Sequence, residues 1–289
     1  MKARANIRMV NVPQPGAVAS GGPPIAWSRF KYPQSLVRFA VLLAVLAFLG
    51  YSLAFLDVRI ERLAFLFSRL GDLLADRYYP PDLTLLSDGN YLESVLETIQ
   101  MAYLGALFGV LLSIPLAWFA SVNVTPHRLL YPFGRLAIMS CRAVHEMIWT
   151  ILFVTILGFG MLPGVLALTL FCVGFAGKLF AEEIEAIDKG PVEAIRATGA
   201  TPLQVFAYAV LPQVRVAWAG IAIYTWDVAF RAATVVGFFG AGGMGWYLQR
   251  YVQQLESQKV AAILISIVAL VVVAEFISAW ARSAVMRTK

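Results

Sequence analysis

Cysteine and charge are both scarce in this chain of 289 residues. The two cysteines, Cys141 and Cys172, lie in apolar segments with no metal-ligand spacing around them, which excludes a disulfide framework and favours buried packing roles. Charged residues make up 14% of the chain and hydrophobic residues 60%, whereas soluble domains carry about 25% charge. The composition predicts an integral membrane protein, with no bound metal and no nucleic-acid partner.

The chain also lacks the Gly-Lys-Ser/Thr loop with which many nucleotide-binding proteins hold phosphates. We therefore expect no ATP hydrolysis and no cofactor on this chain. If ATP drives its activity, ATP and Mg²⁺ must be bound by a separate subunit.

Long apolar segments predict an all-α polytopic membrane protein with six transmembrane helices in the lipid bilayer. The expected spans are residues 36–56, 95–119, 136–158, 164–181, 214–238 and 260–281. The other expected segments are a flexible N-terminal tail (1–35), an amphipathic segment with a loop on the extracytoplasmic side (57–94), a five-helix core (95–281) with a polar loop (182–212), and a basic C-terminal tail (282–289). Lys and Arg are enriched on the side of the two termini, which predicts that both termini are cytoplasmic.

The polar loop between the fourth and fifth spans contains a short motif that begins at Glu193 and ends at Pro212. Gly199 can end one helix, and Thr201 with Pro202 can begin another as a cap and a first-turn proline. We expect two short helices joined by a tight turn in water. Such a projection is suited to docking a soluble partner.

The same motif resembles the cytoplasmic EAA loop of ABC importer permeases, with Ile195 in place of the second Ala and Ala209 in place of the usual Ile. The resemblance implies that this loop couples the permease to an ATPase. The residues it assigns to coupling are Glu193, Ala194, Ile195, Arg196, Gly199, Ala200, Leu211 and Pro212.

Ionisable residues lie within the predicted third and fifth spans, where a charge is costly and usually faces a bundle interior or a wet cavity. Arg142, His145 and Glu146 have helical i, i+3 and i+4 spacing, so we expect them on one face; Asp227 and Arg231 form a second i, i+4 pair. In one interpretation the two Arg residues line a path for an anion. In the other, each Arg only neutralises its neighbouring acid and holds helices together. The sequence leaves both open.

A glycine-rich segment follows the fifth span and is too flexible to continue a regular helix. Its glycines are Gly240, Gly242, Gly243 and Gly245. We interpret it as a gate or a turn that re-enters the bundle, rather than a loose outer loop, because Trp246 and Tyr247 follow as interfacial anchors.

Further segments narrow the resemblance to phosphonate and phosphate-type ABC importer permeases, over residues 95–289. They are Cys141 to Met147, Gly177 to Glu182, Gly190 to Ala200, and Arg231 to Gly237. The resemblance implies a type I (MetI-like) permease core in the bacterial inner membrane, a homodimer, two cytoplasmic ATPase subunits, an extracytoplasmic substrate-binding protein, and alternating access.

Three alternatives stay open. A permease of the same class could carry methionine or an organic sulfonate. A secondary transporter could use Glu146 and Asp227 for ion coupling, although no inverted repeats are evident in the sequence. A passive channel or membrane scaffold would give no reason for the spacing of the loop motif.

Overall fold

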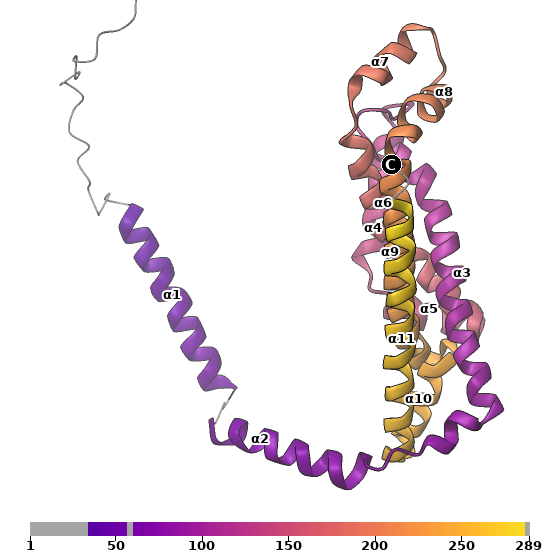
Figure 1. Cartoon of the computed structure of the whole chain (residues 1–289). Helices are drawn as coiled ribbons and strands as arrows, with labels where there is room; N and C mark the ends of the chain where they lie inside the picture. Colours follow the sequence, from indigo (N-terminus) through magenta and orange to yellow (C-terminus); the bar gives the residue numbers. More distant parts are fainter. Residues whose placement is uncertain (1–33, 57–59, 287–289) are drawn as a thin grey trace, which may run out of the picture. The chain divides into compact units, whose positions relative to one another are not determined.

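The structure, a computed structural model, describes residues 34–56 and 60–286 (Figure 1). Contacts divide the chain into two units, Met1–Phe67 and Ser68–Lys289. In the first unit, helix α1 (Gln34–Phe55) is apolar and exposed along almost its whole length. Helix α2 (Ile60–Leu73) crosses the boundary between the units. The predicted N-terminal tail lies outside the described residues, except for its last two residues, which begin α1.

The second unit is a helical bundle, and the described residues contain no strand. Its short elements are η1 (Leu74–Tyr78), η2 (Leu83–Ser87), η3 (Phe206–Val210) and η4 (Gly237–Ala241). Its α-helices are α3 (Gly89–Phe119), α4 (Leu130–Ala143), α5 (Glu146–Leu157), α6 (Met161–Glu185), α7 (Lys189–Ala197), α8 (Pro202–Val205), α9 (Leu211–Val236), α10 (Gly243–Gln253) and α11 (Ser257–Met286).

Five described helices are long and apolar enough to cross a membrane. They are Leu36–Phe55, Gly89–Phe119, Met161–Glu185, Pro202–Ala241 and Ser257–Val285. A sixth span results if the bent pair α4 and α5 counts as one. The predicted all-helical membrane fold is therefore confirmed.

The expected continuous span over residues 136–158 is wrong. The chain leaves the helical conformation at Val144 (φ −110°, ψ 126°), and α4 and α5 meet there at 87°. His145 caps α5, its Nδ1 accepting from the Met147 N–H at 3.4 Å. Arg142 lies in the last turn of α4 and Glu146 in the first turn of α5. Both charges thus complement the helix dipoles on the two sides of the break.

Helices α3 and α6 form the most extensive contact within the bundle. Glycine makes this approach possible: a Cβ at Gly105 would lie 2.6 Å from the Leu168 Cβ, and one at Gly109 would lie 2.2 Å from the Cys172 Cβ. Small residues allow helix backbones to pack closely where lipid provides little hydrophobic driving force.

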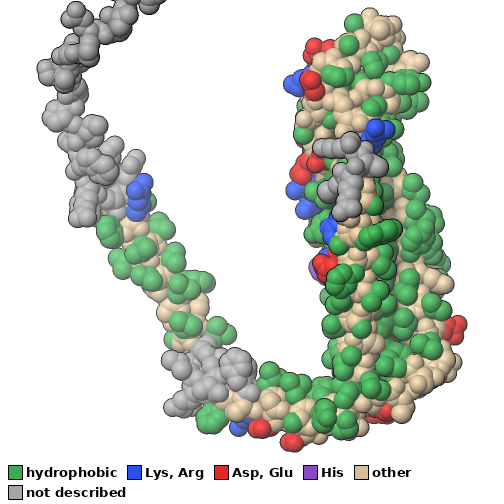
Figure 2. Space-filling model, in the orientation of Figure 1, with side chains coloured by type: hydrophobic (Ala, Val, Ile, Leu, Met, Phe, Trp, Pro, Cys, Tyr) green, Lys and Arg blue, Asp and Glu red, His purple; other side chains and the backbone are tan. Residues whose placement is uncertain are grey.

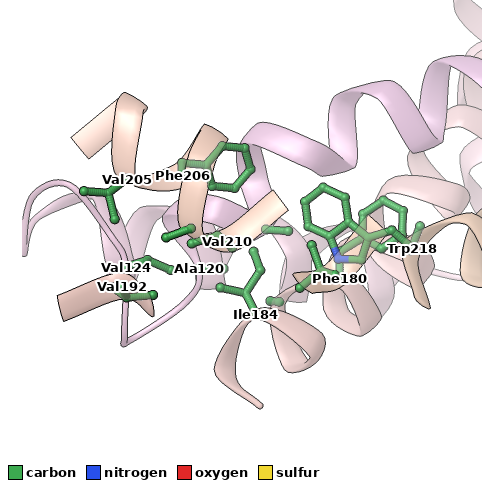
Figure 3. Close-up of a cluster of buried hydrophobic side chains, with 14 of the residues drawn as sticks. Ala120, Val124, Phe180, Ile184, Val192, Val205, Phe206, Val210 and Trp218 are labelled. Carbon is green, nitrogen blue, oxygen red and sulfur yellow. The ribbon is translucent and has the colours of Figure 1, made fainter. Parts of the chain in front are cut away.

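A second packed region lies at the end of the bundle that carries α7 and α8 (Figure 3). Phe180 on α6 stacks on Trp218 of α9 with ring centroids 4.5 Å apart, and Phe206 is 6.2 Å from the same indole. Val192 of α7 and Val205 of α8 are buried in this cluster. The short helices are therefore packed onto the ends of the membrane helices.

Large exposed hydrophobic side chains cover the sides of α3 and α11. Figure 2 shows them along the length of the bundle, whereas charged side chains gather toward α7 and along one edge. This distribution gives a lipid-facing surface on the long helices and a polar surface at the α7 end.

Candidate functional site

The loop between α6 and α9 forms a compact projection at one end of the bundle (Figure 1). Asp188 caps α7, its Oδ1 accepting from the Gly190 N–H at 3.0 Å. After α7 the chain turns at Gly199, whose φ is +80°. The Thr201 N–H then donates to Gln204 Oε1 at 2.8 Å, and Pro202 occupies the first turn of α8. The helix end and the helix start predicted from Gly199, Thr201 and Pro202 are both present.

The second short helix is not separate from the fifth span. Helix α8 continues through the π-helical turn η3 into α9, giving a continuous helical segment from Pro202 to the end of α9 at Val236. Leu211 and Pro212 therefore lie within a helix and not at the end of a loop. Pro212 has no N–H to donate, and the π turn directly before it is a common local adjustment to a proline in a helix.

Helix α7 has a buried side and an exposed side. Val192 is buried and Ile195 packs against the same cluster, while the motif residues Glu193, Ala194 and Arg196 are exposed. The sequence reasoning missed Val192, although its spacing of three from Ile195 is a helical signal.

The α8–η3 segment presents its own apolar side chains beside α7. Leu203 is 63% exposed and Tyr208 is 71% exposed. Large apolar groups at the water-facing end of a membrane protein mark a surface for a protein partner. Sequence reasoning did not single out either residue, because both belong to an apolar segment that could equally have been buried.

The membrane charges are arranged differently from the sequence expectation. Because the helix breaks after Val144, Arg142 does not share a helical face with His145 and Glu146. Among the described residues, Arg142 has no ion-pair partner within 4.0 Å, and Glu146 instead lies 3.2 Å from His145 Nδ1. The expectation that Arg142, His145 and Glu146 share one helical face is therefore wrong, and the described contacts do not support the interpretation in which Arg142 neutralises Glu146.

The second charged pair has the expected i, i+4 geometry. Arg231 Nη2 donates to Asp227 Oδ2 at 3.1 Å. The Asp227 side chain is 4% exposed and the Arg231 side chain 44% exposed. The second Asp227 oxygen is buried without a hydrogen-bond partner in the described part of the chain.

The glycine-rich segment breaks the helix after α9. Phe239 and Gly240 leave the helical conformation, and Gly240, Gly242 and Gly243 have φ values of 99°, 86° and 67°. A Cβ at Gly245 would lie 2.3 Å from the Thr234 carbonyl oxygen, so α10 packs directly against the backbone of α9. The close backbone approach thus requires glycine here, whereas a gating role stays a prediction.

Two polar residues of α3 hold the first turn of α10. The Gly243 N–H donates to Glu97 Oε2 at 2.8 Å, and the Met244 N–H donates to Thr98 Oγ1 at 2.9 Å. A cavity of about 770 Å³ borders this contact and includes Trp246 and Arg250. Sequence reasoning missed Glu97 and Thr98, because they lie 146 residues from their partners and form no local motif.

The described residues contain no group of three or more His, Cys, Asp or Glu side chains that could hold a metal ion.

Comparison with known proteins identifies the family. Residues 91–287 match the family described as "Binding-protein-dependent transport system inner membrane component". The phosphite transport system permease protein PtxC of Stutzerimonas stutzeri is 44% identical over 205 residues, covering 71% of this chain and 74% of the relative. The putative phosphite transport system permease protein HtxC of the same organism is 33% identical over 252 residues, covering 87% of this chain and 88% of the relative. The phosphate-import permease protein PhnE of Mycolicibacterium smegmatis is 44% identical over 153 residues, covering 53% of this chain and 29% of the relative.

Solved structures show the same fold. The inward-facing MetNI methionine ABC transporter has a chain with a TM-score of 0.59 and 23% identity, covering 68% of this chain and 96% of that one. A chain of a bacterial ABC transporter involved in the import of the acidic polysaccharide alginate gives a TM-score of 0.55 and 18% identity, covering 89% of this chain and 98% of that one. The fold is that of a MetI-like ABC permease, and the chain belongs to the family of binding-protein-dependent transport system inner membrane components, as a transport subunit and not an enzyme.

Proposed function

We propose that this chain is the membrane permease of an ATP-driven importer for a phosphorus oxyanion, such as phosphite, phosphate or a phosphonate. Two copies pair in the inner membrane. Each copy binds one ATPase subunit, which carries ATP and Mg²⁺, on the surface formed by α7 and α8. An extracytoplasmic binding protein delivers the ligand at the opposite end. The family supports this assembly, and the names of the relatives support the ligand class.

The observation that carries the anion assignment is the unequal exposure of the membrane charges. The Arg231 side chain is 44% exposed, whereas the side chains of the acids Glu146 and Asp227 are 13% and 4% exposed. Arg142 is also exposed. The exposed charged side chains of this set, Arg142 and Arg231, are therefore both basic.

Exposed cations are costly in hydrocarbon, so this surface must face water or another protein chain. A path lined by a second copy satisfies that requirement for both chains. Basic side chains with low-dielectric walls around them attract anions and raise their local concentration. This supports the interpretation that the charges line a path, beyond any role in helix packing.

In the proposed transport cycle, the ATPase subunits move helix α7. When ATP draws the two ATPase subunits together, the attached α7–α8 projections approach one another, and the packed cluster around Trp218 transmits this movement to α6 and α9. Hydrolysis resets the permease to an inward-facing state. In this arrangement the α7 end is cytoplasmic, and the C-terminal end of α11 lies toward the same end (Figure 1).

The test is purification of the permease with its ATPase and binding protein, followed by ligand-stimulated ATPase and uptake assays in proteoliposomes. The ligand panel contains phosphite, phosphate, hypophosphite, methylphosphonate, methionine and an alkyl sulfonate. We expect stimulation by one or more phosphorus oxyanions only. Stimulation by methionine or sulfonate alone would contradict the ligand class, and uptake without the ATPase would contradict the whole assignment.

A further inference from the structure

The loop between α3 and α4, residues 120–129, lies against the coupling helix α7. Arg196 on α7 donates from Nη2 to the Asn123 carbonyl oxygen at 3.0 Å. The loop is also held to α3, since the Trp118 indole N–H donates to the Val124 carbonyl oxygen at 3.0 Å. Val124 itself is 3% exposed within the cluster that buries Val192 of α7. The loop is therefore a structured part of the coupling end.

Glu185, the last residue of α6, contacts this loop and α4 at once. Its Oε1 accepts from the Val122 N–H at 3.2 Å and from Arg135 Nη2 at 2.5 Å. Its carbonyl oxygen accepts from Asn123 Nδ2 at 2.9 Å. The side chains of Glu185 and Arg135 are each 29% exposed, so water screens this ion pair only in part.

These contacts form a continuous polar connection from α7 to α4. Asn123 receives the hydrogen bond of Arg196 and gives one to Glu185, and Glu185 binds Arg135. The Arg135 guanidinium also lies over the Tyr131 ring at 5.5 Å on the same helix. The contacts of α7 therefore extend to α4 as well as to the cluster around Trp218 of α9.

Helix α4 leads from this connection to the membrane charges. A Cβ at Gly134 would lie 2.8 Å from the Ala120 N, so the start of α4 is closely packed on the end of α3. Arg135 and Arg142 are two helical turns apart, or about 10 Å. Arg142 is in the last turn before the 87° bend into α5. Arg142 and the bend are therefore continuous with the part of α4 that Arg135 joins to Glu185.

We propose that Glu185 is a positioning residue for transport: it ties the displacement of α7 to α4, so that work by the ATPase reorients the basic charges at the α4–α5 bend. This inference rests on the proposed function of the α7–α8 projection. It adds a second route of coupling, beside the continuous helix in which α8 and η3 lead into α9.

The first test measures ligand imported per ATP hydrolysed in proteoliposomes, with the ATPase, the binding protein and phosphite as the supplied ligand. Glu185→Ala and Arg135→Ala should each lower this ratio about fivefold or more, as expected for a coupling interaction. The double variant should be no worse than either single one, because the two residues act through one contact. Glu185→Arg with Arg135→Glu should recover part of the ratio.

The matched control is another ion pair on α6. Lys178 and Glu182 are 3.4 Å apart, with side chains 41% and 49% exposed, and have no contact with the α3–α4 loop among the interactions of the described residues. Exposed ion pairs of this kind contribute little to the stability of a fold. Lys178→Ala, which removes this pair from outside the polar loop, should therefore keep the wild-type ratio.

A second measurement needs no transported ligand. His145→Cys in a Cys141→Ser background places a thiol at the bend, while Cys172 is fully buried. Its rate of reaction with a water-soluble maleimide is compared in the resting complex and in the complex trapped with ADP and vanadate. We expect trapping to change the rate, and Glu185→Ala to remove most of that change.

The two measurements separate the claims. If the wild-type complex imports no phosphorus oxyanion, the proposed ligand is wrong, but the trapping measurement still tests the connection. A normal import-to-hydrolysis ratio and a normal trapping response in assembled Glu185→Ala complexes would overturn the inference. So would fewer assembled complexes with an unchanged ratio, since that result shows a role in stability alone.

Discussion

Replacement of Gly199 tests the coupling loop with little interference from packing. The residue joins α7 to α8 at φ +80°, and no atom lies within 4 Å of where its Cβ would be. A substitution therefore meets no clash and has only the left-handed backbone to oppose it. For a side-chain-bearing residue that conformation costs about 1–2 kcal/mol. Each 1.4 kcal/mol changes an equilibrium constant about tenfold, so the docked geometry of the loop becomes roughly 5–30-fold less populated.

The expected result for Gly199→Val is a loss of ligand import per ATP of that order, with normal amounts of the permease in the membrane. Gly199→Asn is the matched control, because Asn tolerates the left-handed region and should retain most of the coupling. Import and ATPase activity are measured side by side in proteoliposomes. A Gly199→Val complex that couples as well as the wild type would refute the claim that this turn sets the docking geometry.

Three further changes probe other parts of the molecule. Asp227→Asn with Arg231→Gln removes one membrane ion pair without leaving a lone charge. We expect normal assembly and an uptake reduced at least about fivefold, which corresponds to the loss of about 1 kcal/mol of attraction for the anion. Loss of assembly would instead favour a packing role for this pair. Trp218→Ala should destabilise the cluster at the α7 end by about 3–5 kcal/mol, seen as a lower melting temperature in detergent; an unchanged value would contradict the packing described. Gly245→Ala should prevent the α9–α10 contact from forming, because the added Cβ would lie 2.3 Å from the Thr234 carbonyl oxygen. Gly220→Ala is the control and should be tolerated, because no atom lies within 4 Å of its Cβ position. Equal amounts of folded protein for the two variants would contradict the close approach of α10 to α9.

The sequence predicted the features that depend on local chemistry. Apolar length predicted five of the six expected spans, all but the bent third one. A glycine suited to the left-handed region, with a cap and a proline, predicted the two ends of the turn at Gly199 and Pro202. The glycine-rich segment predicted a break after the fifth span. Each of these follows from backbone preferences within a few residues, so no knowledge of neighbouring helices is needed.

The features that sequence reasoning missed depend on contacts between distant segments. The bend after Val144 was not expected, because the apolar residues on both sides continue without a glycine or proline between them. The two helix ends that meet at this bend are nevertheless stabilised by the charges of Arg142 and Glu146 and by the His145 cap. No local pattern predicts a partner for Glu185, and only the folded chain shows its contact with Arg135, fifty residues away.

The most direct test of the account is uptake by proteoliposomes that hold the permease with and without its ATPase subunit, with the binding protein and a phosphorus oxyanion supplied outside and ATP inside. We predict concentrative uptake only when both the ATPase and ATP are present, and its loss with vanadate. Concentrative uptake by the permease alone, driven by an ion gradient, would contradict the account.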